Sequence, residues 1–361
     1  MAEVTLPEGW SSFVTGCATC PDDTLPGAQT LAVVHCYDIT GGVPDGTISS
    51  NNAAQMNYVS GNPETFMAIV TDQSGFAVNY PLSTSYQAVN ATGETLTGIT
   101  ALPLPGSATA TFVGQTAGCG RQGKSDERSV YHTLSSLSPT YLGNSVVMAY
   151  FSYDTNTVTY LSFPISNTLS PVTWAKKGDR FWHPTTSPNS LVRWSIAAGG
   201  AEQVSTDISA ICSSTEHIMA LHASENFLYM LIRSGVVTTI YQLDLDLMTV
   251  QDSWSIHAST PNAVSMHVVD DDLIYIWNVD DSLTYGFYYL VMSTDTVTKI
   301  GTVLQTETCT PAPFTTSGHL GFHFNKGYFY LTSGGFSVGA PNITKIGTLR
   351  CPGLEDRIGT I

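Results

Sequence analysis

The stretch VTKIGTV, residues Val297–Val303, recurs almost letter for letter as ITKIGTL, residues Ile343–Leu349. The two copies start 46 residues apart, and a more diverged copy, TVQDSWSI (Thr249–Ile256), precedes the first of them by a similar interval. An internal period of this size indicates an array of similar supersecondary units, none of which can bury its own apolar faces alone. The repeat therefore decides the fold, once the type of unit is known.

A short strand centred on a tyrosine precedes each copy. The central residues are Tyr229, Tyr275 and Tyr330, and the longer second interval contains the proline-rich insert TCTPAPFTTSG. Runs of Val, Ile, Thr and Tyr alternate here with Gly, Asp, Asn and Ser, and no helical spacing of apolar residues is present. This pattern predicts strands joined by tight turns rather than pairs of helices.

One unit can be followed strand by strand over residues 215–256. It contains TEHIMALHAS, NFLYMLIRS, VVTTIYQLDLD and VQDSWSI, with turns at Ser234-Gly235 and at Leu247–Thr249. Four antiparallel strands in about 45 residues resemble one blade of the β-propeller superfamily. The resemblance is architectural, because the chain carries neither a Trp-Asp signature, nor kelch glycines, nor a sialidase Asp box. It implies an all-β propeller of about seven four-stranded blades, with six or eight as alternatives.

The expected propeller covers residues 25–350. Leu31–Tyr37 is interpreted as the opening strand of its first blade, and residues 103–144, the least propeller-like stretch, as a candidate insertion. Residues 1–24 form an N-terminal segment that is expected to close the ring, through Val4–Val14 paired with the last blade. Residues 351–361 form a C-terminal tail, in which Gly353–Ile361 could instead pair with the first blade.

Composition excludes several classes of protein. The 361 residues carry 29 Asp and Glu against 13 Lys and Arg, a net charge of −16, yet only 12% are charged and 42% are hydrophobic. Disordered chains combine low hydrophobicity with high charge density, so this one is expected to fold. A surface so acidic does not favour binding to nucleic acid. The chain also lacks the roughly 18 consecutive apolar residues that would predict insertion into a membrane.

Two groups of residues are candidate metal ligands. The carboxylates of Asp270, Asp271 and Asp272 could hold Ca²⁺, although their spacing is not that of an EF-hand and a polar hairpin turn explains them more simply. Cys17 and Cys20 form a C-x-x-C pair that could be redox-active or contribute half of a zinc site, but no second pair accompanies it. Structural roles are the simpler interpretation of both groups, and no cofactor is expected.

The chain resembles structural proteins of bacteriophage tails, of the nozzle, knob or hub kind. It is acidic, poor in Lys, rich in Thr, Ser, Gly and Tyr, repetitive and free of recognised catalytic motifs. The resemblance implies a non-catalytic virion protein that assembles in the host cytoplasm. Its partners would be other tail proteins, further copies of itself in a ring, and a host receptor or glycan.

The alternative is an extracellular carbohydrate-binding or glycoside-hydrolysing propeller. The six tryptophans of the chain could stack on sugar rings. They are Trp10, Trp174, Trp182, Trp194, Trp254 and Trp277. Most of them fall at strand positions, where packing in the core is the simpler interpretation. A missing leader peptide at the start of the sequence also counts against secretion.

The fold can be tested in solution. Far-ultraviolet circular dichroism of the purified chain should show a β spectrum with negligible helix, because every repeated unit is built from strands and turns. A substantial helical signal would refute the propeller.

Overall fold

The computed structural model describes the strands of the chain and part of their connections. The described residues are 29–38, 51–61, 64–72, 84–90, 95–100, 109–111, 129–138, 146–152, 157–163, 175–186, 189–197, 201–214, 217–279, 284–304, 322–325, 328–332 and 342–348. Most of them lie in β-strands, and no helix in these ranges is long and apolar enough to cross a bilayer. The expected all-β class is confirmed.

The strands form four-stranded antiparallel units in chain order, which we number as blades, and the last two of these units are joined into one eight-stranded sheet. Blade 1 contains β2 (Asn51–Gly61), β3 (Glu64–Asp72), β4 (Thr84–Asn90) and β5 (Thr95–Thr100). Blade 2 contains β6 (Thr109–Thr111), β7 (Ser129–Ser138), β8 (Val146–Ser152) and β9 (Thr157–Phe163). Blade 3 contains β10 (Ala175–Lys177), β11 (Arg180–Thr186), β12 (Asn189–Ser195) and β13 (Ala201–Asp207).

The second half of the chain continues this order. Blade 4 contains β14 (Ile218–Ala223), β15 (Phe227–Ser234), β16 (Val237–Asp244) and β17 (Val250–Ser255). Blade 5 contains β18 (Ala263–Val268), β19 (Leu273–Val279), β20 (Thr284–Val291) and β21 (Thr296–Leu304). Blade 6 contains β22 (Phe322–Asn325), β23 (Tyr328–Thr332) and β24 (Asn342–Thr348), and its fourth strand is β1 (Gln29–Asp38).

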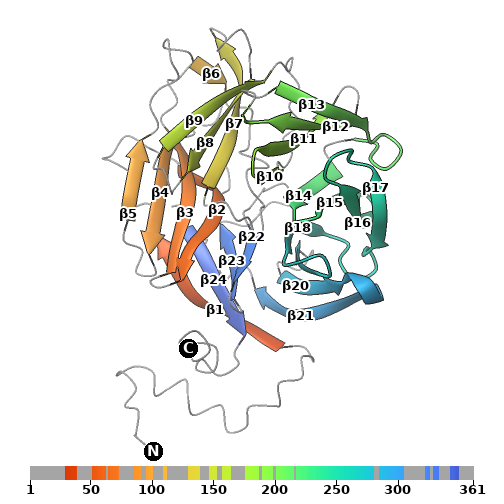
Figure 1. Cartoon of the computed structure of the whole chain (residues 1–361). Coiled ribbons are helices and arrows are strands. Elements are labelled where there is room, and N and C mark those ends of the chain that lie inside the picture. Colours follow the sequence, from red (N-terminus) through yellow and green to blue (C-terminus); the bar gives the residue numbers. More distant parts are fainter. Residues whose placement is uncertain are drawn as a thin grey trace, which may run out of the picture.

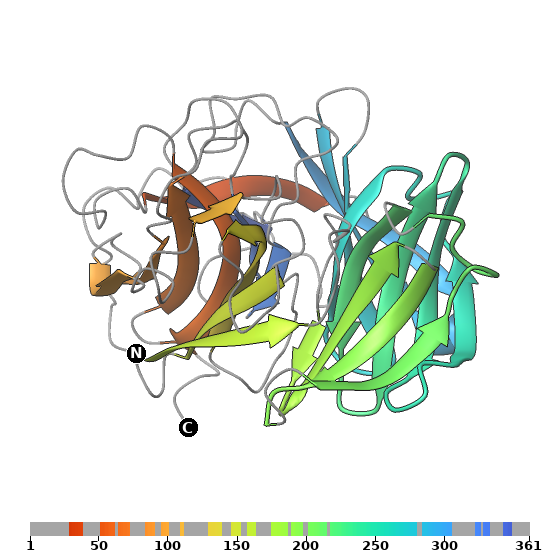
Figure 2. The ribbon, with the colours of Figure 1, turned by 90° about the horizontal axis from the view of Figure 1, so that it is seen from above.

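The blades follow one another around a common centre, which makes the molecule a β-propeller (Figure 1). First strands of neighbouring blades lie beside one another, β10 by β14, β14 by β18, β18 by β22 and β22 by β2. Seen from above, the green and teal sheets of blades 3 and 4 stand side by side (Figure 2). The described strands account for six blades, the lower alternative, and the expected seven are not confirmed within these ranges.

The difference between six and seven comes from β1. The sequence interpretation places Leu31–Tyr37 at the opening of a first blade, but β1 pairs antiparallel with β24, from Leu31 opposite Thr348 to Asp38 opposite Asn342. The first described strand therefore completes the last blade and closes the ring. The sequence predicts ring closure by residues 1–24 instead, and β1 begins after that segment. That segment, with Val4–Val14, lies outside the described residues, as do 351–361.

Two further expectations concern strand positions. Tyr229, Tyr275 and Tyr330 lie on β15, β19 and β23, the second strands of three consecutive blades, as their spacing predicts. Strands β6 and β7 fall within residues 103–144 and pair in one sheet with β8 and β9. Most of that range lies outside the described residues, so an insertion there stays a prediction.

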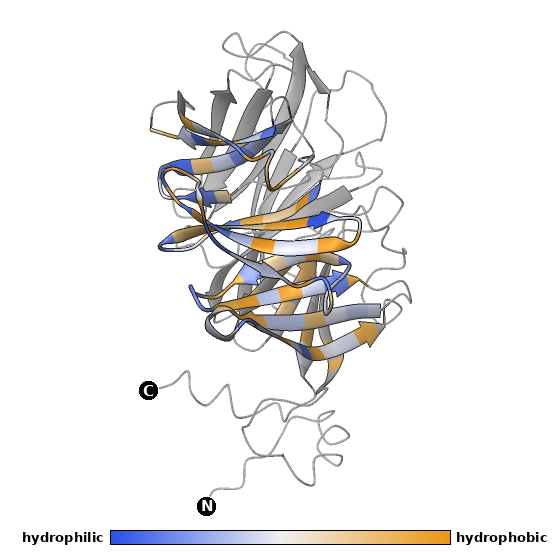
Figure 3. Cartoon of the chain, turned by 90° about the vertical axis from the view of Figure 1, so that its right-hand side faces the viewer, coloured by the Kyte–Doolittle hydropathy of each residue, from blue (hydrophilic) through white to orange (hydrophobic). Residues whose placement is uncertain are grey.

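Blade 4 shows why its strands are apolar on both sides. Along β15, Leu228, Met230 and Ile232 belong to an apolar cluster shared with blade 3. Tyr229 and Leu231, which alternate with them, belong to a second cluster shared with blades 5 and 6. Successive side chains of a strand point to opposite faces, so a sheet packed between two neighbours needs apolar residues at nearly every position. Figure 3 shows this concentration of apolar residues within the stacked strands.

Glycine occupies the first position of two hairpin turns that contain only two residues. Gly235 follows Ser234, which pairs with Val237 across a two-residue turn, and Gly235 has a φ of 57°. Gly178 takes the same place, with a φ of 53°, in the turn that joins β10 to β11. A first turn residue with positive φ matches the right-handed twist of the flanking strands and favours glycine. The turn predicted at Ser234-Gly235 is confirmed.

Candidate functional site

The three aspartates proposed as metal ligands form the turn between β18 and β19. The Oδ1 atom of Asp270 accepts hydrogen bonds from the backbone N–H groups of Asp272 and Leu273, each at 2.9 Å. The Oδ1 atom of Asp272 accepts one from the N–H of Ser293 at 2.7 Å. Asp270 thus shapes its own turn, as aspartate commonly does, and Asp272 binds that turn to the one between β20 and β21.

Asp271 instead points to the neighbouring blade. Its Oδ1 atom accepts a hydrogen bond from the hydroxyl of Ser224 at 2.5 Å, and its Oδ2 atom accepts one from the amide of Asn226 at 2.5 Å. The hydroxyl of Tyr229 donates to Oδ1 at 3.2 Å and accepts in turn from the amide of Gln242. One carboxylate of blade 5 therefore holds three donors of blade 4.

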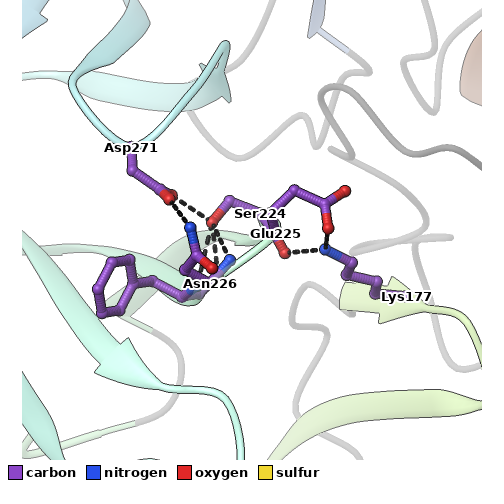
Figure 4. A network of polar contacts seen from close by, with 6 residues as sticks. Lys177, Ser224, Glu225, Asn226 and Asp271 are labelled. Carbon is purple, nitrogen blue, oxygen red and sulfur yellow. Dashed lines mark hydrogen bonds and ion pairs between the residues drawn. The ribbon is translucent and has the colours of Figure 1, made fainter.

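The network continues into blade 3 through Lys177. Its ammonium donates to the backbone carbonyl of Ser224 at 2.6 Å and forms an ion pair with Glu225 at 2.9 Å. Figure 4 shows Lys177 on one side and Asp271 on the other side of the turn that carries Ser224. The turn between the first two strands of blade 4 is thus tied to both neighbouring blades. We call Lys177, Ser224, Glu225, Asn226 and Asp271 the turn network.

The arrangement does not bring the three carboxylates together on one ion. Asp270, Asp271 and Asp272 bond to three different partners, and within the described ranges no group of three or more metal-ligating side chains gathers at one place. The calcium interpretation therefore has no support from their geometry. Cys17 and Cys20 lie outside the described residues, and the zinc and redox interpretations of that pair stay predictions.

A second set of polar contacts ties blades at the turns between third and fourth strands. Asp246, in that turn of blade 4, forms ion pairs with Arg180 and Arg193 of blade 3, the former at 2.8 Å. The indole N–H of Trp182 donates to the carbonyl of Leu245 in the same turn at 3.1 Å. Because strands alternate in direction, these turns lie on the same face of the propeller as the turn network.

Blades 4 and 5 share a contact of the same kind. The indole N–H of Trp254, on β17, donates to the carbonyl of Met292 at 3.2 Å, in the turn between β20 and β21. In both pairs of blades an indole of the earlier blade thus reaches a backbone carbonyl of the later one. A buried indole N–H that lacks an acceptor costs stability, so each contact fixes the spacing between two blades.

Two histidines lie where first strands meet at the centre. His222 of β14 and His267 of β18 are buried, with their ring centroids 6.1 Å apart in an edge-on arrangement. The Nδ1 atom of His267 accepts a hydrogen bond from the backbone N–H of Phe324 on β22 at 3.2 Å. In this contact Nδ1 is the acceptor, so the ring joins the first strands of blades 5 and 6. The histidines connect blades 4, 5 and 6.

Burial keeps other ionisable groups uncharged. It lowers the pKa of His183, on β11, to about 3, and it raises the pKa of the Cys212 thiol to about 11. Burial is also the main cause of the raised pKa of the Tyr229 hydroxyl, to which the neighbouring Asp271 adds. All three groups stay neutral at pH 7, as expected for packing roles within and between blades.

Sequence reasoning missed Lys177, Ser224 and Asn226, although one signal marks the kind of turn that reaches across to a neighbouring blade. Asp244 accepts hydrogen bonds from the N–H groups of Asp246 and Leu247, just as Asp270 does from the second and third residues after it. The shared pattern is D-x-D-L, which occurs at one turn of blade 4 and one of blade 5, both on this face. The residue that reaches the neighbouring blade differs between the two turns. In blade 4 it is Asp246, the second aspartate of the pattern, whereas in blade 5 it is Asp271, at the variable position, and Asp272 bonds within its own blade. The local pattern therefore identifies the turn but not the partner of each aspartate.

Comparison with known proteins adds likenesses in shape alone. No protein-family model matches the chain, and no curated protein matches it in sequence. It is similar to glutaminyl cyclase from Myxococcus xanthus, with a TM-score of 0.41, 9% identity, and coverage of 89% of this chain and 97% of that one. It is also similar to the PQQ-bound aldose sugar dehydrogenase from Streptomyces coelicolor, with a TM-score of 0.43, 7% identity, and coverage of 90% and 99%.

A third solved structure is TolB from Acinetobacter baumannii, with a TM-score of 0.40, 11% identity, and coverage of 73% of this chain and 60% of that one. None of these likenesses bears on function. The propeller architecture rests on the strand pairing of the chain itself.

The turn network predicts that substitutions of its two acidic residues, Asp271 and Glu225, destabilise the fold unequally. Asp271→Ala removes the carboxylate that Ser224, Asn226 and Tyr229 share as acceptor, and we expect it to lower the free energy of unfolding by about 1–3 kcal/mol. Glu225→Ala removes an ion pair whose carboxylate is 81% exposed, and exposed pairs contribute little. Urea denaturation of both full-length variants measures the difference, and equal losses would contradict the network.

Proposed function

We propose that the chain is a non-catalytic structural protein of a virion, most specifically a component of a phage tail. In this proposal the rigid propeller docks through its turns onto neighbouring tail subunits or a host receptor, after assembly in the host cytoplasm. The observation that carries the proposal is that polar side chains bind neighbouring blades to one another. Lys177, Asp246 and Asp271 join one blade to the next, which stiffens a ring rather than building a catalytic cleft.

The tryptophans support this function over carbohydrate recognition. Trp182, Trp194, Trp254 and Trp277 are buried in the packed blades. Stacking on a sugar needs an exposed aromatic face, which none of these four offers. Trp10 and Trp174 lie outside the described residues. The carbohydrate-active alternative is therefore less well supported in the described part of the chain.

The exposed apolar tip of one hairpin gives the proposal an attachment surface. Val236 is 79% exposed at the tip of the hairpin between β15 and β16, and Val237 beside it is 48% exposed. Leu247 is 60% exposed in a turn on the opposite face. The hairpin of Val236 is a two-residue turn fixed by Gly235, and a rigid apolar tip suits an anchor in a protein interface.

The proposal is tested in virions. If the chain is a tail component, its gene should lie beside terminase and portal genes, and purified virions should contain it at a constant number of copies by quantitative mass spectrometry. Val236→Asp should reduce incorporation into particles, because the charge would have to be desolvated in the interface. Leu247→Asp, on the opposite face, is the matched control and should be incorporated normally.

Two results would contradict the proposal. One is the absence of the chain from virions encoded by the same genome. The other is hydrolysis of a glycan by the purified chain, abolished by the substitution of a single carboxylate, which would establish the carbohydrate-active alternative.

A further inference from the structure

Both copies of the sequence repeat contact β1, although they do not occupy equivalent positions in their blades. The copy at 297–303 lies on β21, the fourth strand of blade 5, whereas the copy at 343–349 lies mostly on β24, the third strand of blade 6. In the eight-stranded sheet that spans the two blades, the strand order is β21, β1, β24. The feature that the copies share is therefore their neighbour rather than their place in a blade.

The two copies also pair with β1 through the same two residues of the repeat. On one side of β1, Gly301 and Thr302 pair in parallel with Gln29 and Thr30. On the other side, the Gly-Thr pair of the second copy, residues 347 and 348, lies antiparallel to residues 32 and 31. The same dipeptide thus contacts the start of β1 from both sides. We call the space between β21 and β24 the strand slot.

The slot holds β1 by backbone pairing and by two apolar side chains. Leu31 is 3% exposed and belongs to the apolar cluster that also contains Ile346, Phe329 and Val303, and Val33 packs against that cluster. The neighbours of β1 in the sheet are β21 and β24, from blades 5 and 6. Blade 1, to which the chain leads after β1, supplies neither of these neighbours.

We propose that the strand slot also binds β1 from a second copy of the chain, so that copies assemble by exchanging this strand. An exchanged β1 forms the same ladder and buries the same side chains as its own β1, and exchange of an identical element is a low-cost route to oligomers. The connection from Asp38 to Asn51 gives each chain's own β1 a high effective concentration. Closed monomers therefore dominate in dilute solution, and exchange increases with protein concentration.

The exchange can be trapped with one added cysteine. Cys36 lies opposite Thr344 in the β1–β24 ladder, and Cα atoms of such a pair are about 4.5–5.5 Å apart, within the range that a disulfide spans. The full-length Thr344→Cys variant is unfolded under reducing conditions, refolded at low micromolar or at near-millimolar concentration, and then oxidised. Non-reducing electrophoresis and intact mass separate links within one chain from links between chains.

We expect monomers with an internal disulfide at low concentration, and covalent dimers and larger species whose share rises roughly in proportion to concentration. The matched control is Lys345→Cys. Residue 345 pairs with His35, and adjacent residues of a strand project to opposite faces, so this cysteine should not link to Cys36. Both variants keep the seven native cysteines, so adventitious links affect them equally.

Three outcomes would overturn the proposal. Internal disulfides at every concentration would show that the slot accepts only its own β1, and equal dimer formation by Lys345→Cys would show non-specific links. The third is the absence of any link between Cys36 and the cysteine introduced at position 344, which would contradict the register itself. If Thr344→Cys fails to fold, native mass spectrometry of the wild-type chain decides. The chain is refolded at both concentrations and measured at once after dilution, because each β1 must leave the slot before an exchanged dimer can separate, and the absence of dimers refutes exchange. None of these outcomes depends on whether the chain belongs to a virion.

Discussion

The ladder between β1 and β24 is the interaction on which the rest of the structure depends. It joins a strand near the start of the chain to the last described strand, from Leu31 opposite Thr348 to Asp38 opposite Asn342. Without it blade 6 would be left with three strands, and the ring would keep an open edge and an uncovered apolar face. Each blade buries its faces only against its neighbours, so closure stabilises every blade in the ring.

Polar side chains also join neighbouring blades. Lys177 and Asp271 bind the turn of Ser224 from opposite sides, and the indoles of Trp182 and Trp254 each reach a carbonyl of the next blade. These directional contacts hold neighbouring sheets at a fixed angle, whereas apolar packing alone would let one sheet slide over the next. A chain in which only 12% of residues are charged thus uses several of them between blades.

Much of the fold could be predicted because blades 4 and 5 have local patterns. The strands around Tyr229 and Tyr275, and the turn at Gly235, follow from alternation and turn chemistry alone. The place of β1 could not be predicted, because its residues specify a strand but not which distant strand it pairs with. The role of Asp271 was missed for a related reason. An acidic turn has the same sequence whether its carboxylate binds a metal ion or the neighbouring blade.

Hydrogen–deuterium exchange of the full-length chain, followed by mass spectrometry of peptides from Gln29–Asp38, tests ring closure most directly. The amide hydrogens of β1 that face β24 should exchange as slowly as those of β15, a central strand of blade 4, since both then open only when the packed ring opens. Fast exchange of β1 while β15 stays protected would mean that this strand does not close the ring, and it would contradict the account.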